Sequence, residues 1–123
     1  MPPRIVIVDD DPSFLATVRQ LLEAEGFAVV GEALNGLDGV AVAAETAPDI
    51  VLVDVTLPDI DGFEVVERLA DGENAPPAVL TSIRSAEDFG SLIETSRARA
   101  FIPKADITGQ ALAGLLDERA GTA

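Results

Sequence analysis

The chain has 123 residues, 48% of them hydrophobic, and a net charge of −14, which suits one globular domain with a buried core. So acidic a chain lacks the positive surface that attracts nucleic acids and anionic membranes, which excludes both as direct ligands. It contains no cysteine and no histidine, so disulfides, zinc sites and Ser-His-Asp triads are also excluded. These properties lead us to expect a cytoplasmic domain.

Five short runs of apolar residues, rich in β-branched side chains, alternate with segments of helical periodicity. Each run is almost continuously apolar, as expected for a strand that is buried on both faces of a sheet. In chain order the predicted strands cover residues 5–8, 28–30, 50–53, 78–80 and 100–102.

Between these strands, apolar residues recur at the spacing of amphipathic helices. Asp11 is placed to cap the first helix and Gly26 to follow its end, while Thr108 precedes the last helix. The fourth helix, over residues 86–96, is only weakly apolar. The predicted buried stripes are, in chain order, Phe14, Val18, Leu21 and Leu22; Leu37, Val40, Ala41 and Ala44; Phe63, Val66, Leu69 and Ala70; Phe89, Leu92 and Ile93; and Leu112, Leu115 and Leu116.

Strands that alternate with helices require right-handed crossovers and a parallel sheet with helices on both faces. The small version of this arrangement is the flavodoxin-like α/β sandwich, a three-layer (βα)5 fold with a five-stranded sheet of order 2-1-3-4-5. We therefore predict a single domain over residues 1–123, with its core over residues 4–119.

Polar side chains follow four of the predicted strands, at the point where each strand ends. Asp9 and Asp10 follow the first strand, Asp54 the third, Thr81 the fourth, and Lys104 the fifth. Open α/β sheets keep their binding sites at the carboxyl ends of parallel strands, and these four strands are neighbours in the predicted order. We therefore expect all five side chains to converge in one crevice.

Three carboxylates packed together repel one another and need a counter-charge. A cluster of oxygen ligands without histidine or cysteine suits a hard cation, Mg²⁺ or Mn²⁺. Lys104, the one lysine of the chain, adds an ammonium and Thr81 a hydroxyl. Cation, ammonium and hydroxyl together suit phosphoryl transfer, in which a free carboxylate can serve as the nucleophile and form an aspartyl phosphate.

Four segments carry a more specific pattern: residues 7–10 read IVDD, 54–62 DVTLPDIDG, 79–82 VLTS and 100–104 AFIPK. Together, in this order, they resemble the CheY-like receiver domain of bacterial two-component response regulators. The resemblance covers residues 4–119. Ala105 follows the lysine at the position where receivers usually have proline. This ending is most similar to the NarL/LuxR-type branch. Without the proline, the chain lacks a peptide bond that is often cis in the family.

The resemblance implies a role for each residue of the predicted crevice. Asp54 would be the phosphoacceptor, and Mg²⁺ would bind Asp10 directly, Asp9 often through water, the Asp54 carboxylate, and the backbone carbonyl of Thr56. Lys104 would bind a phosphoryl oxygen.

A switch between two surface states is implied as well. Thr81 would move onto another phosphoryl oxygen, and Phe101 would fill the vacated space. The signal would leave through the surface formed by helix 4, strand 5 and helix 5, which we expect to be available to a homodimer or output partner. That surface is expected around Ser91, Arg97, Arg99 and Ala111.

Several residues near these motifs have simpler structural explanations. Asp59 and Asp61 are interpreted as solvated turn residues, and Pro58 and Gly62 as turn chemistry before a helix. Leu15 lies at the edge of the first stripe, as part of either the core or a partner surface.

The resemblance therefore predicts a phosphorylation-controlled switch that accepts its phosphoryl group from a sensor histidine kinase. Such a domain assists its own phosphorylation and dephosphorylation but is not an ordinary enzyme. The alternatives are an interaction module that works without phosphorylation, an aspartyl-phosphate phosphatase, for which Thr56 stands where an acid is needed, and a flavin carrier, for which no Trp or Tyr is present. The few residues after the last helix leave no room for an output domain, so the receiver either stands alone or belongs to a longer DNA-binding regulator.

Overall fold

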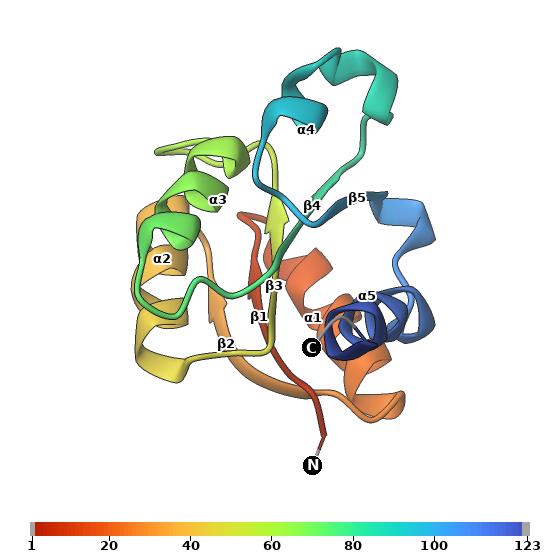
Figure 1. Ribbon diagram of the computed structural model, residues 1–123. Helices are drawn as coiled ribbons and strands as arrows, with labels where there is room; N and C mark the ends of the chain where they lie inside the picture. Colours follow the sequence, from red (N-terminus) through yellow and green to blue (C-terminus); the bar gives the residue numbers. More distant parts are fainter. Residues whose placement is uncertain (1, 122–123) are drawn as a thin grey trace.

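The five strands pair in parallel in one sheet of order β2-β1-β3-β4-β5, as predicted (Figure 1). The computed structural model describes residues 2–121, with side chains up to residue 116, so residues 1, 122 and 123 of the predicted domain lie outside the described residues. The strands are β1 (Arg4–Val8), β2 (Ala28–Ala33), β3 (Ile50–Asp54), β4 (Ala78–Ser82) and β5 (Ala100–Pro103). The helices are α1 (Pro12–Ala24), α2 (Gly36–Thr46), α3 (Gly62–Asp71), α4 (Leu92–Thr95) and α5 (Gly109–Gly121), with 3-10 turns η1 (Ala86–Phe89) and η2 (Lys104–Asp106).

Alternate residues of the strands enter two separate hydrophobic cores, one on each face of the sheet. In β1, Ile5 and Ile7 belong to the core with α1 and α5, whereas Val6 and Val8 belong to the core with α2 and α3. Figure 1 shows these two pairs of helices on opposite sides of the sheet. Because both faces are covered, the central strands are apolar at nearly every position.

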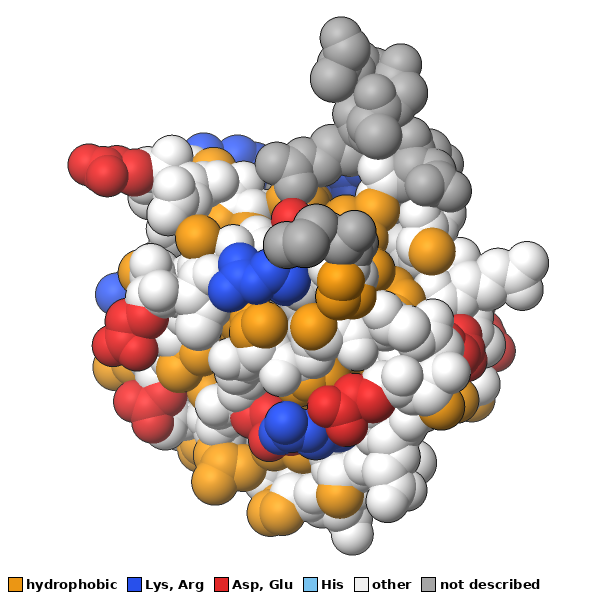
Figure 2. Space-filling model, turned by 90° about the horizontal axis from the view of Figure 1, so that it is seen from below, with side chains coloured by type: hydrophobic (Ala, Val, Ile, Leu, Met, Phe, Trp, Pro, Cys, Tyr) orange, Lys and Arg blue, Asp and Glu red, His pale blue; other side chains and the backbone are white. Residues whose placement is uncertain are grey.

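The end of the sheet at which β1 begins is seen in Figure 2, where hydrophobic, acidic and basic side chains are interspersed over the surface. No helix in the described part of the chain has the length and apolar composition needed to cross a membrane.

The polar residues that were predicted to follow β3 and β4 are the last residues of those strands. Asp54 ends β3, and Thr81 and Ser82 end β4. Asp54 lies opposite Thr81 in the register, and the backbone N–H of Val55 donates to the carbonyl of Thr81 at 2.9 Å. Strand pairing therefore continues past the apolar runs and holds both polar side chains on a rigid backbone.

Helix α1 buries Leu15, Val18 and Leu22, so Leu15 belongs to the core. Leu21, which was predicted to be buried, is 37% exposed. The helix begins as predicted, because the Asp11 carboxylate accepts a hydrogen bond from the backbone N–H of Ser13 at 3.0 Å.

The predicted buried face of α2 is wrong except at Val40, which is half-buried against the core. The helix buries Gly36, Gly39 and Ala43, whereas Leu37 is 48% exposed. A Cβ atom at Gly39 would lie only 2.7 Å from a methyl carbon of Val8, so the helix lies too close to the sheet for larger side chains. Small residues therefore make the closest approach to the sheet, Val40 and Val42 pack half-buried against the same core, and Leu37 faces outward. Ala41 and Ala44 are also exposed.

The predicted fourth helix over residues 86–96 is present only as two short helical turns. The turn η1 and the single turn of α4 are separated by Gly90, whose φ of 57° lies in the left-handed region. None of the residues 86–89 and 92–95, all of which the structure describes, is buried. This segment lacks the apolar contacts that would hold a longer helix in place.

We expect Gly39→Ala to destabilise the protein, because overpacking costs about 1–3 kcal/mol and exceeds the roughly 0.5–1 kcal/mol that alanine gains over glycine in a helix. Gly114→Ala in α5 is the matched control, because a Cβ there meets nothing within 4 Å. Urea unfolding should show a lower midpoint for the first variant and an equal or higher one for the second. A stabilised Gly39→Ala would refute the close packing of α2.

Candidate functional site

Asp9 and Asp10 follow β1 directly but differ in exposure. The backbone N–H of Asp9 still donates to the carbonyl of Ala33 at 3.0 Å, so strand pairing continues through this residue. The Asp9 side chain is fully buried, and its Oδ1 accepts a hydrogen bond from the N–H of Asp11 at 2.9 Å. Asp10 is exposed. One carboxylate is thus fixed inside the crevice while the other lies at its mouth.

The third carboxylate, that of Asp54, enters the same crevice from the neighbouring strand. Its Oδ1 accepts a hydrogen bond from the backbone N–H of Thr56 at 3.2 Å. One oxygen from each of Asp9, Asp10 and Asp54 lies within 4.8 Å of the other two. The sequence therefore identified side chains that the fold does bring together.

Lys104 begins η2 directly after β5 and reaches back into this cluster. Its Nζ lies 2.8 Å from Oδ2 of Asp9 and 3.2 Å from Oδ2 of Asp54, and its side chain is only 16% exposed. One ammonium cannot balance three carboxylates, so the cluster keeps an excess of negative charge that a bound cation would neutralise.

The pKa values of the paired groups follow from this crowding. Burial raises the pKa of Asp54, and the charge of Asp9 raises it further, although the hydrogen bond from Thr56 and the charge of Lys104 oppose this. Burial lowers the pKa of Lys104, but its hydrogen bond to Asp9 and the charges of Asp54 and Asp9 outweigh burial, so that this pKa is raised. The ammonium is therefore firmly protonated at neutral pH.

The hydroxyl at the end of β4 is buried without a partner. Thr81 is 1% exposed, and among the described residues nothing forms a hydrogen bond with its Oγ1. An unsatisfied buried hydroxyl costs free energy, which makes it a group that a ligand could satisfy. The neighbouring Ser82 hydroxyl instead accepts a hydrogen bond from the N–H of Arg84 at 3.1 Å.

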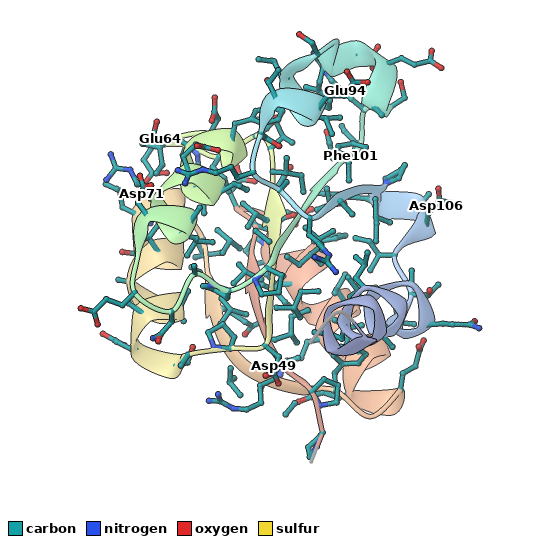
Figure 3. The ribbon with its side chains drawn as sticks, viewed as in Figure 1. Asp49, Glu64, Asp71, Glu94, Phe101 and Asp106 are labelled. Carbon is teal, nitrogen blue, oxygen red and sulfur yellow. The ribbon has the colours of Figure 1, made fainter. Side chains whose placement is uncertain are left out.

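Phe101 on β5 lies below the segment that carries η1 and α4 (Figure 3). Its ring centroid lies 5.8 Å from that of Phe89 in η1, and Phe89 in turn lies 5.9 Å from Phe63 in α3. Phe101 itself is only half-buried. The row of rings is an apolar anchor for a segment that buries no residue of η1 or α4.

Comparison with protein families decides what this arrangement is. The response regulator receiver domain family matches residues 5–113, a range that includes every residue of the crevice. The chain belongs to this family.

The relatives of this receiver domain include regulators of transcription, protein-glutamate methylesterases and solved receiver domains. BvgA of Bordetella pertussis, a transcription regulator of virulence factors, is 46% identical over 66 residues, which cover 54% of this chain and 32% of that protein. A LuxR-family response regulator from Aurantimonas sp. SI85-9A1 has a TM-score of 0.86 and 28% identity over 96% of this chain and 87% of that one. The NarL receiver domain from Mycobacterium tuberculosis also has a TM-score of 0.86, with 26% identity over 94% and 97%. The predicted resemblance to the NarL/LuxR type is thus confirmed.

The receiver domain spans only part of its curated relatives, between 25% and 49% of the length of those it matches.

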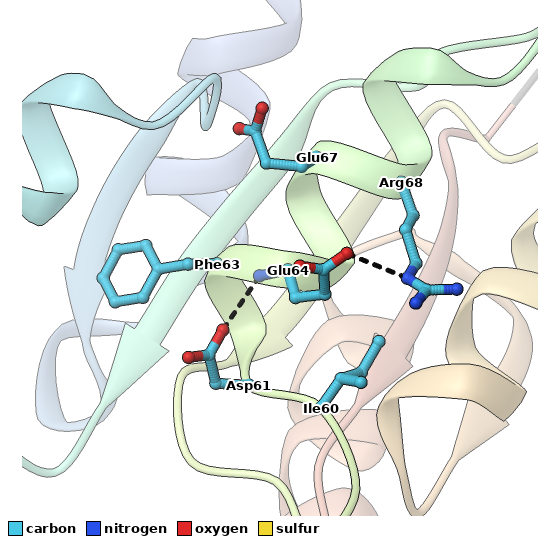
Figure 4. A pocket seen from close by; sticks show the side chains of 6 residues that line it. All are labelled: Ile60, Asp61, Phe63, Glu64, Glu67 and Arg68. Carbon is cyan, nitrogen blue, oxygen red and sulfur yellow. Dashed lines mark hydrogen bonds and ion pairs between the residues drawn. The ribbon is translucent and has the colours of Figure 1, made fainter.

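Two acidic side chains and one aromatic side chain make contacts that the sequence did not predict. Asp59 accepts hydrogen bonds from the N–H groups of Gly36 and Leu37 at 2.7 and 2.8 Å, so it caps α2 from a distant loop. Asp61 caps α3 by accepting from the N–H of Glu64 at 2.9 Å, at the edge of a shallow pocket (Figure 4). The third residue is Phe14, whose ring lies against Lys104.

Only one of these contacts had a local signal. Asp61 followed by Glu64 is typical of a helix start, whereas Asp59 and Phe14 act on residues that are distant in sequence. Asp59 and Asp61 are exposed residues of the turn before α3, as expected, and each also caps a helix. Gly62 is the start of a helix, as expected, and a Cβ there would lie 2.5 Å from the carbonyl oxygen of Asp54. The glycine thus lets α3 approach the backbone of the site.

Asp59 generates a pH-dependent prediction. Desolvation raises its pKa, but the backbone hydrogen bonds from Leu37 and Gly36 prevail, so the pKa lies below the ordinary 3.8. Its contribution to stability is therefore complete above that value and is lost as the pH falls through the lowered pKa of the folded state. We expect Asp59→Asn to lower the urea midpoint at neutral pH, with the difference from wild type shrinking below pH 3.8.

Asp88→Asn, a change at an exposed carboxylate in η1, serves as the control and should leave the midpoint unchanged. A difference between Asp59→Asn and wild type that stays constant through the acid range would contradict the charged cap.

Proposed function

We propose that this receiver domain accepts a phosphoryl group from a sensor histidine kinase on Asp54 and acts as a signalling switch in the cytoplasm. The observation that carries the proposal is the buried Asp54 carboxylate at the end of β3, beside two further carboxylates and within 3.2 Å of the Lys104 ammonium. A carboxylate oxygen of Asp54 would form the new P–O bond as the P–N bond to the kinase imidazole breaks. The imidazole keeps the electron pair and takes up a proton.

The donor atoms fit a magnesium ion, with manganese as a substitute. They are oxygens only, and those of Asp9, Asp10 and Asp54 are close enough to share one ion. With the backbone carbonyl of Thr56, these carboxylates would hold it. When bound, the ion supplies positive charge that offsets the repulsion among the carboxylates and the phosphoryl oxygens.

Two groups of the chain, one ammonium and one hydroxyl, would hold the phosphoryl oxygens themselves. Lys104 is already directed at Asp54 by its ion pairs. Thr81 lies opposite Asp54 in the register, and its unpaired hydroxyl would gain a hydrogen bond that the unphosphorylated carboxylate does not provide. That difference in binding between the two states is what a switch requires. The domain's own residues would assist phosphoryl transfer to and from Asp54, but the domain acts as a switch and not as an ordinary enzyme.

The output surface is the one formed by α4, β5 and α5, open to a second copy or to an output partner. Phe101 would move into the space that Thr81 vacates and, through its contact with Phe89, change the position of the segment between β4 and β5. Arg97 is exposed beside this surface and also binds α3: its Nε lies 2.8 Å from Glu67, and its Nη2 lies 2.8 Å from Asp71. We further propose that the 123 residues form one such domain, which binds neither nucleic acid nor membrane directly.

The test of the acceptor uses mass spectrometry after incubation with a small phosphodonor and Mg²⁺. Wild type should gain one phosphoryl group, and Asp54→Asn, which conserves shape, should gain none while keeping its fold. Asp88→Asn, at an exposed position in η1, should be labelled like wild type. Full labelling of Asp54→Asn would move the acceptor elsewhere, and no labelling of wild type would favour an interaction module that works without phosphorylation.

The route of the signal is tested by NMR shifts on addition of beryllium fluoride and Mg²⁺. In wild type, changes should extend from the crevice to residues 83–103. Thr81→Ala should still bind the anion at Asp54 but should show smaller shift changes at residues 83–103, because it lacks the hydroxyl that would move to bind the anion. Distant changes of full size in Thr81→Ala would exclude this residue as the link.

A further inference from the structure

We infer that Phe14 is a positioning residue for Lys104, an inference that rests on the proposed phosphoryl site. The Lys104 Nζ lies 4.2 Å from the centroid of the Phe14 ring, well within the range of a cation–π contact. The same nitrogen forms ion pairs with Asp9 and Asp54. The ammonium thus has three neighbours, two of them charged and one an aromatic face.

The position of the ring is set by α1 and not by the crevice. Asp11 and Pro12 define the start of α1, and Phe14 lies in its first turn. The half-buried ring packs against the core that includes Leu15 and Val18, so it is supported from the side of the helix. A ring held in this way can hold a cation in turn.

The environment favours an electrostatic contact over simple packing. The Lys104 side chain is only 16% exposed, and a cation–π contact strengthens as water is removed from the cation. Lysine would otherwise be free to rotate about its four-carbon stem, with its ammonium returning to water.

The ring matters most when the carboxylates change partners. A cation on Asp9 and a phosphoryl group on Asp54 would each weaken one of the two ion pairs that Lys104 now makes. The contact with Phe14 depends on neither carboxylate and would persist. Phe14 therefore keeps the ammonium in the crevice and available to the anion on Asp54, while contributing little to the binding of the cation itself.

The first experiment measures the contact without any ligand. Lys104 is the only lysine, so lysine-selective ¹⁵N and ¹³C labelling gives NMR signals from this side chain alone. The face of the ring should shift the Hε protons of Lys104 upfield. Phe14→Leu should remove that shift, and Phe14→Tyr should retain it. Phe27→Leu, a change in the same core away from Lys104, is the control and should also retain it.

The second experiment measures binding of beryllium fluoride in the presence of saturating Mg²⁺, and of Mg²⁺ alone, by titration. Phe14→Leu should weaken the binding of beryllium fluoride by about threefold to tenfold, which corresponds to a partly desolvated cation–π contact. It should change Mg²⁺ binding by less than about twofold. Phe14→Tyr should restore anion binding. If Phe14→Leu does not fold, Phe14→Met, which also lacks a ring, takes its place.

The outcomes separate this inference from the proposed function. An unchanged Lys104 shift in Phe14→Leu would overturn the contact whether or not the domain binds an anion. If Phe14→Leu and Phe27→Leu weaken the binding of beryllium fluoride equally, Phe14 contributes only to core packing and its positioning role is overturned. Wild type that binds no beryllium fluoride would instead refute the phosphoryl site, and with it the role of Phe14 there, even if the Lys104 shift is as expected.

Discussion

One ammonium shared among crowded carboxylates is the interaction on which this structure depends. Asp9 is fully buried, and its Oδ2 has the Nζ of Lys104 as its charged partner. Removing one member of a buried ion pair leaves an uncompensated charge that costs about 3–5 kcal/mol. Lys104 therefore stabilises the folded crevice, although it cannot neutralise it. The same imbalance that strains the crevice would favour a bound cation, so stability and the proposed function depend on one set of charges.

The fold makes this arrangement possible because four parallel strands have their carboxyl ends side by side at the same end of the sheet. Covering both faces of the sheet buries the strands, and only their ends remain for polar groups. Close packing keeps the ends in place: Gly62 lets α3 approach the backbone of Asp54, and Gly39 lets α2 approach Val8. Against this rigid part, the segment between β4 and β5 has few anchors, chiefly the ring of Phe89 and the ion pairs of Arg97. A ligand at the strand ends would therefore move that segment before it moved the sheet.

Much of this could be predicted from the sequence, because strands buried on both faces leave continuous apolar runs and because strand ends place residues by topology alone. The strand order and the convergence of Asp9, Asp10, Asp54 and Lys104 followed from those two facts.

What failed depends on contacts between distant segments. The exposed Leu37 of α2 reflects a helix that packs through glycines, which carry no hydrophobic signal. The short α4 reflects missing tertiary contacts, which a weak periodicity of apolar residues cannot reveal. Asp59 caps a helix 22 residues away in sequence, and no local pattern marks such a bond.

Thermal unfolding with and without Mg²⁺ tests whether the carboxylates of Asp9, Asp10 and Asp54 form a cation site. An ion that binds only the folded state should stabilise wild type by about 2.7 kcal/mol at a hundred times its dissociation constant. In Asp10→Ala, which removes the exposed carboxylate and leaves the buried pair with Lys104 intact, that gain should largely vanish. A midpoint that Mg²⁺ does not raise in wild type, or raises equally in Asp10→Ala, would contradict the account.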